Sequence, residues 1–549
     1  MRFGVVGSGP AGIAAATTLL RAGHEVEVLD WGNVPEASSR ALAQSLREVI
    51  LEGRELPRQA VAQLRLGQLG VTELLRRIPA AATVRKATLG SHFVFADTTD
   101  KLPVTGAQVV RSLARGGLSN VWGAACYPLT TADYDDWPIT ETDMAKHYRA
   151  AAEMMGLREA PDALEAIYRL YAPENHGANL SRNPGSPIDD LVPKWASNES
   201  LLTEAGLSVG RSRLAVNLPG SADANCRQCG LCTHGCPFGS IYVSIRTLEQ
   251  LMEQPKFTYV RGIMVEHFRE TESDVIVGSR RRSGERFEAT YDAVFLAGGT
   301  LGTLQLSAAS LGAENHSFRL LDNDMFIVPF WISHSIPREY QSRFGLSESA
   351  IAIQKEDDGG EGVHLQLYSY NDSFIGAARN LITALPRPAN RLARALLNRV
   401  AIGAVYLNGR ESRHAEARIV RAPDGTWPLR VTAIPNELSR LALRRTLRRL
   451  EQSRHSLGLK PIRSLVRATP FGFSSHLAGT FPMRKEASRF ETNSDGTHHG
   501  HRRVFVVDGS IFPALPAQNP TYTIVANAMR VADGAARTLA LISPPETNA

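Results

Sequence analysis

The chain has 549 residues, enough for two or three domains, and its 43% hydrophobic and 21% charged residues are typical of a soluble globular enzyme. A formal charge of +6, without a basic stripe carrying interleaved aromatic residues, excludes a nucleic-acid-binding protein. The sequence contains no run of about 18 uninterrupted apolar residues and starts directly with a predicted strand, so we expect neither a transmembrane helix nor a signal peptide. We therefore expect a cytoplasmic protein.

The first thirty residues predict a nucleotide-binding unit. Residues 2–6 form a short apolar strand, residues 13–22 an Ala/Leu-rich helix, and residues 25–29 an alternating strand that ends at Asp30. The first strand and the helix are joined by a turn of six residues: Gly7, Ser8, Gly9, Pro10, Ala11 and Gly12. This order of elements is the dinucleotide-binding pattern of a Rossmann-type fold: a strand, a G-x-G-x-x-G turn, a helix, a second strand and an acid.

The parts of this unit have separate physical roles. Gly7 allows the tight turn, Gly9 lets the backbone approach a pyrophosphate, and Gly12 lets the helix pack closely on the strand. The helix N-terminus offers unpaired N–H groups and a partial positive charge to the phosphates. Asp30 accepts hydrogen bonds from a ribose hydroxyl, which indicates FAD or NAD rather than a cofactor with a 2′-phosphate.

Four segments follow before the cysteine-rich region. Residues 36–90 have a helical pattern and are predicted to be an insertion, and residues 91–95 are predicted to form a strand. Residues 115–124 combine paired glycines with small polar residues, which suits a loop that passes close to a cofactor. Thr140 is the predicted N-cap of a helix that runs through Ala151.

Four of the five cysteines lie within eleven residues, which is too concentrated for a disulfide framework: Cys226, Cys229, Cys232 and Cys236. Their C-x2-C-x2-C-x3-C-P spacing matches the ligand run of bacterial ferredoxins and predicts an iron–sulfur cluster of the 4Fe–4S or 3Fe–4S type. Zinc is an alternative, although structural zinc usually takes two separated ligand pairs, and four thiols without a metal are another. Cys126 stands apart and is predicted to be a core thiol.

The middle of the chain predicts two kinds of structure. Residues 257–265 are a predicted strand, and residues 292–303 are a buried strand that runs into glycines and a helix, as where a dinucleotide-binding domain returns to its cofactor. Residues 326–332, 364–368 and 401–407 are predicted strands of an antiparallel sheet. A predicted helix over residues 437–458 carries a face of arginines for which we expect solvent exposure, with a peripheral membrane or partner surface as the alternative: Arg440, Arg444, Arg445, Arg448 and Arg449.

The C-terminal residues carry the candidate chemistry. His476 lies in a turn of small residues, and residues 504–513 form a strand that ends in an acid and a glycine. Residues 517–523 then open a last helix, whose N-terminus would favour the negative charge of a reduced flavin. The polar loop before the strand contains three histidines that we expect at the surface rather than as ligands: His498, His499 and His501.

Three C-terminal motifs occur in order: His-x-x-Gly-Thr, Val-x-Asp-Gly-Ser and Asn-Pro. Together with residues 116–123, they resemble the glucose–methanol–choline (GMC) family of FAD oxidoreductases. The resemblance implies that His476 and Asn519 are the catalytic pair, with Asn519 where many members carry a second histidine. It also implies that further residues contact the FAD: Gly116, Gly117, Ser119, Asn120, Val260, Gly298, Asp508, Gly509, Pro520 and Thr521. Val121 stands where pyranose oxidase carries a flavin-linked histidine, so non-covalent FAD is expected.

These observations predict an α/β protein. A discontinuous Rossmann-type FAD-binding domain would cover residues 1–314, with the insertion at 36–90 and a cysteine loop at 221–243, and residues 466–549. A substrate-binding domain with a mostly antiparallel sheet and helices would cover residues 315–465. The cysteine loop is also similar to the cluster loop in the large subunit of membrane-linked glucose and gluconate dehydrogenases, although the cysteine spacing differs.

The predicted reaction is oxidation of a primary or secondary alcohol, with His476 as base and hydride transfer to flavin N5, while Asn519 orients the substrate oxygen. Sugar-like polyols are the preferred substrate class, and three aromatic residues are candidates to contact them: Trp331, Tyr368 and Tyr406. With a cluster, electrons would leave to an acceptor protein or a quinone; without one, dioxygen would accept them. A flavin-containing lyase is a further alternative. A pyridine-nucleotide disulfide reductase is excluded, because the sequence lacks a second G-x-G-x-x-G and a redox cysteine pair near the first.

Overall fold

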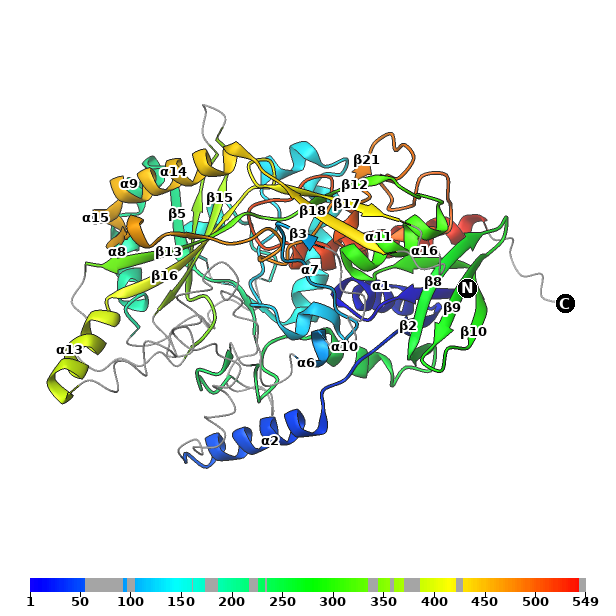
Figure 1. Ribbon diagram of the computed structural model, residues 1–549, viewed down its shortest axis with the longest axis horizontal. Helices are drawn as coiled ribbons and strands as arrows, with labels where there is room; N and C mark the ends of the chain where they lie inside the picture. Colours follow the sequence, from blue (N-terminus) through cyan, green and yellow to red (C-terminus); the bar gives the residue numbers. More distant parts are fainter. Residues whose placement is uncertain are drawn as a thin grey trace.

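The computed structural model of the protein describes residues 1–54, 92–95, 104–159, 161–172, 186–216, 226–232, 235–333, 344–355, 360–369, 386–420 and 428–542. Figure 1 shows an elongated molecule in which the N-terminal strands lie toward one end and the antiparallel sheet toward the other. The fold is of the mixed α/β class, as predicted, and its strands are divided among several sheets.

A five-stranded parallel sheet forms the core of the N-terminal lobe. Its strand order is β23 (Val504–Val506), β11 (Ala293–Leu296), β1 (Arg2–Val6), β2 (Glu25–Asp30) and β7 (Phe257–Arg261). All neighbouring strands are parallel. Because parallel neighbours need crossover connections, the chain leaves this sheet and returns to it from distant parts of the sequence. The nucleotide-binding unit is therefore discontinuous, as predicted.

Three helices pack beside this sheet. Half of the buried residues of α1 (Pro10–Arg21) are alanines, and these small side chains let the last helix, α16 (Thr521–Ile542), pack against it. The helix α7 (Glu141–Met155) also packs against α16. Thr140 caps α7 as predicted, because its hydroxyl accepts the N–H of Asp143 while the Asp143 carboxylate accepts the N–H of Thr140.

An antiparallel meander extends the same lobe. It consists of β8 (Ile263–Glu270), β9 (Val275–Arg281) and β10 (Arg286–Tyr291), and α11 (Gly299–Ser310) packs against β8. The single strand predicted over residues 257–265 is therefore wrong. Gly262 separates β7 from β8 with a φ of +81°, a left-handed conformation that turns the chain into a second sheet.

The second lobe contains the predicted antiparallel sheet. Its order is β19 (Leu459–Pro461), β13 (Met325–Ile332), β16 (Val400–Leu407), β15 (Val363–Ser369), β14 (Ser349–Ile353) and β5 (Leu207–Arg211), and β20 (Arg467–Ala468) also pairs with β13. The three predicted strand segments are confirmed as β13, β15 and β16. Because β5 pairs with β14, a segment N-terminal to residue 315 enters this sheet. The exact domain boundaries stay a prediction.

Four helices pack on the second sheet: α8 (Val192–Ser197), α9 (Glu199–Glu204), α14 (Glu437–Gln452) and α15 (Arg454–Leu457). Their buried leucines and a tryptophan share one apolar core with β13 and β15. The helix predicted over residues 437–458 is thus two helices, which meet at Ser453 and end at Gly458 with a φ of +68°. Figure 1 shows α14 along the outer side of the sheet.

The remaining elements connect or extend these lobes. A third sheet contains β12 (Ser317–Leu321), β17 (His414–Ile419), β18 (Leu429–Ile434) and β3 (Val104–Thr105), and two small ladders pair β4 (Leu157–Arg158) with β6 (Leu214–Ala215) and β21 (Met483–Arg484) with β22 (Thr492–Asn493). The other described helices are α2 (Ala37–Leu51), α6 (His92–Phe95), α10 (Ser244–Leu251) and α13 (Arg387–Leu397). None of the described helices combines the length and apolar character needed to cross a bilayer.

The segment at 91–95 corrects one prediction, and the insertion at 36–90 lies partly outside the described residues. Residues 92–95 form the short helix α6 rather than a strand, because Phe93 and Val94 are buried together with Ala114 in a small apolar cluster beside the 115–124 loop. In the predicted insertion, α2 is helical as expected, whereas residues 55–90 lie outside the described part of the chain.

Candidate active site

The glycine turn between β1 and α1 leaves room for a ligand at one position and is closed at the others. A Cβ on Gly7, whose φ is +103°, would lie 2.5 Å from the carbonyl oxygen of Ala297, and a Cβ on Gly12 would lie 2.0 Å from the carbonyl oxygen of Gly7. A Cβ on Gly9 would have no atom of the described residues within 4 Å. Pro10 begins α1, and Gly9 provides no side-chain cap to the first N–H groups of the helix. The turn therefore fits a dinucleotide pyrophosphate.

Asp30 lies at the end of β2, next to this turn. Its Oδ2 accepts hydrogen bonds from the hydroxyls of Ser8 and Tyr259, the latter at 2.9 Å. Burial raises the pKa of Asp30 to about 6, against the opposing effect of these hydrogen bonds. Val260 on β7 is in register with Leu29, so it lies beside Asp30 at the same sheet edge. The structure thus brings the predicted ribose-binding acid to the glycine turn.

The 115–124 loop packs directly on the glycine turn. The N–H of Gly116 donates to the Ser8 hydroxyl at 2.9 Å, and a Cβ on Gly117 would lie 3.4 Å from the Cα of Gly9. The Ser119 hydroxyl donates to the carbonyl of Gly116 at 2.6 Å. Similarly, the Asn120 amide donates to the carbonyl of Gly117 at 2.7 Å. Ser119 and Asn120 therefore hold the backbone of the loop in shape beside the predicted pyrophosphate site.

Asp508 connects the C-terminal loop to the start of α11. Its Oδ2 accepts the Thr303 hydroxyl at 2.6 Å, and its Oδ1 accepts the N–H of Ser510 at 2.9 Å. The Thr303 hydroxyl in turn accepts the N–H of Gly298, the residue before α11, at 3.1 Å. Burial raises the pKa of Asp508. The predicted residues Gly298 and Asp508 therefore belong to one local network.

Gly509 joins this network to the turn that carries His476. Its carbonyl accepts the N–H of Gly479 at 2.9 Å, and a Cβ on Gly509 would lie 2.9 Å from the carbonyl oxygen of Leu477. The same Leu477 carbonyl accepts the Thr300 hydroxyl at 2.6 Å. A glycine is needed at position 509 because the two loops approach each other at this point.

The structure brings His476 and Asn519 together. The Nδ2 of Asn519 lies 3.2 Å from the Nε2 of His476, and Pro520 and Thr521 continue from Asn519 into α16. The ring of Tyr406 stacks on the half-buried imidazole of His476, with centroids 5.3 Å apart. Burial lowers the pKa of His476 to about 3, so its imidazole is neutral near neutral pH. A neutral imidazole beside a carboxamide is a suitable arrangement for accepting a proton from a hydroxyl group.

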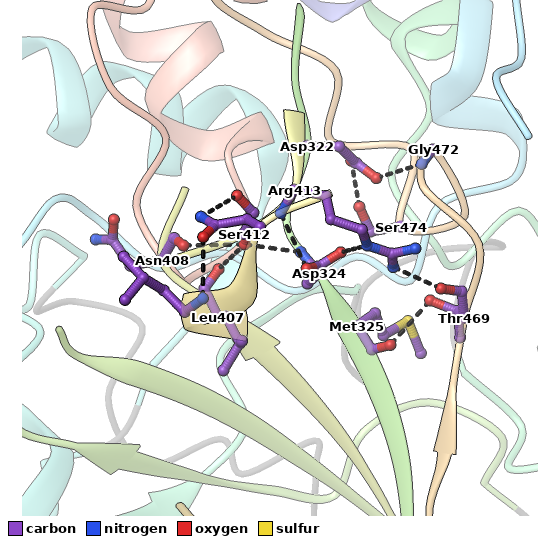
Figure 2. A network of polar contacts seen from close by, with 12 residues as sticks. Asp322, Asp324, Met325, Leu407, Asn408, Ser412, Arg413, Thr469, Gly472 and Ser474 are labelled. Atoms are coloured by element: carbon purple, nitrogen blue, oxygen red, sulfur yellow. Dashed lines mark hydrogen bonds and ion pairs between the residues drawn. The ribbon is translucent and has the colours of Figure 1, made fainter. Parts of the chain in front are cut away.

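Three consecutive polar residues between β12 and β13, each only 2% exposed, support this pair: Asp322, Asn323 and Asp324. Asp322 accepts the backbone N–H of Gly472 at 2.8 Å and the Ser474 hydroxyl (Figure 2). It also accepts the backbone N–H of His476 at 2.9 Å. Burial raises the pKa of Asp322 to about 7. The next residue, Asn323, places its Oδ1 2.8 Å from the Nδ1 of His476.

Asp324 anchors this triplet to the neighbouring strand. It forms an ion pair with Arg413, whose Nε lies 2.7 Å from the Asp324 Oδ1, and it also accepts the backbone N–H of Arg413. Arg413 donates in turn to the carbonyl of Thr469 at 2.7 Å (Figure 2). The sequence-based prediction missed all three residues of the triplet. Their signal is a run of acids and an amide between two apolar strands, where buried polar groups need specific partners.

Alternate residues of β15 form a second layer behind Asn519. Gln366 donates to the Oδ1 of Asn519 and accepts the Tyr368 hydroxyl at 2.8 Å. His364 is fully buried, its Nδ1 lies 3.1 Å from the Tyr168 hydroxyl, and burial lowers its pKa to about 3. The prediction missed His364 and Gln366, although polar residues at positions 364 and 366 alternate along a strand, which indicates that they share a face.

The candidate aromatic residues are not all in this layer. Tyr368 belongs to this layer and donates to Gln366, whereas Tyr406 stacks on His476. Trp331 on β13 instead lies under the guanidinium of Arg399, at 5.9 Å from the ring centroid. A role for Trp331 in substrate contact stays a prediction.

His498 corrects the expectation of a surface loop. It is only 1% exposed, its Nε2 lies 3.0 Å from the Ser307 hydroxyl, and its ring packs edge-on against Phe481. The loop folds inward because Thr497 pairs with Phe505 of β23 and the His498 N–H donates to the carbonyl of Val504. His499 is exposed, as expected.

The cysteine loop lies between α2 and the large core of the N-terminal lobe. Cys229 packs with Leu231 and Leu46, whereas the other three cysteines of the run pack on that core. All four are free thiols, and burial raises the pKa of Cys229 to about 11. Within the described ranges, no group of three or more His, Cys, Asp or Glu side chains has an arrangement that would hold a metal ion. The iron–sulfur cluster stays a prediction. Cys126 is fully buried, which confirms it as a core thiol.

Comparisons with known proteins agree with this geometry. Residues 410–528, which include His476 and Asn519, match the family model described as GMC oxidoreductase. The chain is 25% identical over 480 residues to 6'''-hydroxyparomomycin C oxidase of Streptomyces lividus, covering 77% of this chain and 79% of that protein.

Solved structures show the same fold. Pyridoxine 4-oxidase from Mesorbium loti is 14% identical, with a TM-score of 0.56 over 97% of this chain and 98% of that one. A variant of formate oxidase from Aspergillus oryzae RIB40 is also 14% identical, with a TM-score of 0.58 over 98% of both chains. The fold, the family match and the glycine turn lead to one conclusion: the C-terminal part of the chain, residues 410–528, matches the GMC oxidoreductase family, and the chain has the fold of the two oxidases named above.

Proposed function

We propose that this protein oxidises a primary or secondary alcohol to the corresponding carbonyl compound with non-covalently bound FAD. The arrangement around His476 carries the proposal: its Nδ1 lies 2.8 Å from the Asn323 Oδ1, and its Nε2 lies 3.2 Å from the Asn519 Nδ2. This leaves a neutral imidazole with one nitrogen directed to the carboxamide of Asn519. The relatives named above as oxidases of hydroxyparomomycin C and pyridoxine support an alcohol as the substrate.

The residues that would hold FAD form two groups. The glycine turn, Asp30 and the 115–124 loop would bind the adenosine and pyrophosphate, and the loop around Asp508 and Gly509 would lie by the flavin. The open space at Gly9 fits this assignment, because it leaves the backbone accessible to phosphate oxygens. When bound, FAD would supply the acceptor for the hydride that leaves the alcohol carbon.

The protein's own residues would handle the proton. His476 Nε2 takes the hydroxyl proton of the alcohol while the Asn519 amide donates to the alcohol oxygen and fixes its position. As that proton leaves, the oxygen's electron pair forms the carbonyl bond and the C–H bond breaks with both its electrons. The half-buried position of His476 limits water around the imidazole and keeps it neutral before the reaction.

We propose dioxygen as the final electron acceptor and a sugar-like polyol as the substrate class. The relatives named as oxidases support the first point, and hydroxyparomomycin C in the name of one relative supports the second. Tyr406 stacks on His476 and would be an aromatic neighbour of such a substrate. Formation of hydrogen peroxide during turnover would support dioxygen as the acceptor.

A second candidate for the acceptor is an iron–sulfur cluster in the cysteine loop, from which electrons would pass to a partner protein or a quinone. One observation favours it: the loop leads straight into residues that contact the nucleotide turn. Tyr242 accepts the Trp122 indole N–H at 2.7 Å, and Ser244 donates to the carbonyl of Ser8 at 3.0 Å. Iron and acid-labile sulfide analysis of anaerobically purified protein decides between the two acceptors.

Substitution of His476 tests the proposed reaction. His476→Ala should lower the rate of anaerobic flavin bleaching by the active alcohol about 10²–10⁴-fold, because the general base is lost. His499→Ala removes an exposed imidazole and serves as the matched control. Near-parental bleaching in His476→Ala would remove this residue as the base. A lack of bleaching by any alcohol in the parent protein, with lyase products formed instead, would favour a flavin-containing lyase.

A further inference from the structure

Two buried amides, Asn323 and Gln366, lie at opposite ends of the His476–Asn519 pair. We propose that they are positioning residues: Asn323 fixes which nitrogen of His476 carries the proton, and Gln366 fixes which end of the Asn519 amide faces His476. This inference rests on the proposed function in one respect, because it assigns the proton-accepting atom of the same site. The direction of each hydrogen bond can be derived from groups that have no choice of role.

The derivation begins at Asn323, which is fixed by two backbone carbonyls. Its Nδ2 lies 2.8 Å from the carbonyl oxygen of Leu407 and 2.8 Å from that of Pro516. Carbonyl oxygens only accept hydrogen bonds, so both must receive the N–H groups of the amide. The Oδ1 of Asn323 consequently faces His476 and acts as an acceptor.

The tautomer of His476 follows from that orientation. Because the Asn323 Oδ1 has no proton to give, the 2.8 Å contact requires a proton on the Nδ1 of His476. In a neutral imidazole the Nε2 then carries a lone pair. This lone pair faces the Nδ2 of Asn519 at 3.2 Å, so the amide of Asn519 must be the donor.

The hydrogen bonds at the other end of the pair, around Gln366, agree with Asn519 as the donor to His476. With Nδ2 facing His476, the Oδ1 of Asn519 faces Gln366 and accepts from its Nε2. The same Nε2 lies 3.4 Å from the Nε2 of His364, and the Gln366 Oε1 accepts the Tyr368 hydroxyl at 2.8 Å. Rotation of the Gln366 amide by half a turn would bring two oxygens together at Asn519.

This direction has a consequence for catalysis. In the other tautomer, the Nε2 that faces Asn519 would already hold a proton and would be unable to accept one from an alcohol. A side chain that only filled space at position 323 would allow both tautomers. We therefore expect the loss of Asn323 to act on the chemical step more than on alcohol binding.

The test compares Asn323→Ala with Asn436→Ala. Asn436 also donates from its amide to two backbone carbonyls, those of Arg410 at 3.3 Å and Ser412 at 3.0 Å, and it also caps α14. Among its described contacts, none is with His476. Asn323→Ala should lower the rate of flavin reduction about 10²-fold and change the alcohol dissociation constant less than about threefold, whereas Asn436→Ala should change neither by more than about threefold.

A second measurement reads the tautomer directly. In protein labelled with ¹⁵N-histidine, with FAD bound, the His476 resonances are identified by their absence in His476→Ala. We expect a protonated Nδ1 and an unprotonated Nε2 in the parent and in Asn436→Ala, and a mixture of tautomers in Asn323→Ala. An unchanged Nδ1–H tautomer in Asn323→Ala would overturn the role of Asn323, whatever the activity of the enzyme. If alcohol oxidation itself is disproved, this spectrum still tests the inference.

Gln366→Met provides an independent variant if Asn323→Ala fails to fold. Methionine has a similar length but cannot donate to the Oδ1 of Asn519. Flavin reduction should fall about tenfold or more while the His476 tautomer stays as in the parent, because Asn323 is intact. Parental flavin reduction in Gln366→Met would overturn the role of Gln366.

Discussion

Because His498 is buried as a neutral imidazole, the protein should become less stable in mild acid, and His498→Gln should remove that effect. His498 is 1% exposed, and its Nε2 lies 3.0 Å from the Ser307 hydroxyl. Glutamine keeps a polar group near Ser307 and cannot be protonated in this pH range. His499→Gln is the matched control, because it removes an exposed imidazole from the same loop.

The magnitude follows from the pKa of His498 in the two states. Burial and the nearby His501 lower the pKa of His498 in the folded protein to about 3, whereas the unfolded chain has a value of about 6.5. Between these values only the unfolded state binds the proton, so stability decreases as the pH falls from about 6.5 toward 3. At pH 5 the unfolded state gains RT ln(1 + 10^1.5), or about 2 kcal/mol, from this one residue.

Urea unfolding at pH 7.5 and pH 5.0 measures this difference. The decrease in the free energy of unfolding between the two pH values should be smaller in His498→Gln than in the parent by about 2 kcal/mol. It should be the same in His499→Gln as in the parent. An equal decrease in His498→Gln and the parent would show that His498 is already protonated in the folded protein or exposed to solvent, and would refute the reasoning.

Three further predictions concern the site. Because burial lowers the pKa of His476 to about 3, the rate of flavin reduction should stay constant as the pH falls to about 5, and a half-maximal rate near pH 6.5 in stopped-flow measurements would contradict this. Gly12→Ala should yield protein with little FAD, measured as flavin absorbance per protein, because the new Cβ would lie 2.0 Å from the Gly7 carbonyl oxygen; full FAD content would count against the assigned turn. Asp322→Asn should lower the free energy of unfolding by about 1–3 kcal/mol, measured with urea at pH 8, since an NH₂ group would face donors of the 472–476 turn; an unchanged value would argue against the network.

The nucleotide-binding unit was predictable from the sequence because its determinants are local. The glycine turn, the first helix and Asp30 lie within thirty consecutive residues. Gly7 and Gly12 are required by close contacts with neighbouring backbone, whereas Gly9 leaves open space. The strands of the antiparallel sheet were also predictable, since residues 326–332 and 401–407 are nearly continuous apolar runs and residues 364–368 alternate polar and apolar side chains. By contrast, residues 92–95 combine the same residue types in a short helix, because the small cluster around Ala114 decides their conformation.

The sequence by itself determined that this chain has a dinucleotide-binding turn and a histidine followed by an asparagine in family motifs. Only the tertiary structure decided what surrounds that pair. Asn323 lies 153 residues from His476, and Gln366 lies 153 residues from Asn519, so no spacing in the sequence relates them. Asn323 reaches His476 because of where the link between β12 and β13 lies in the fold. Gln366 reaches Asn519 because of where the middle of β15 lies. The physical reason is that a buried polar side chain takes its partners from the packing of whole strands, which residue type and local pattern do not specify.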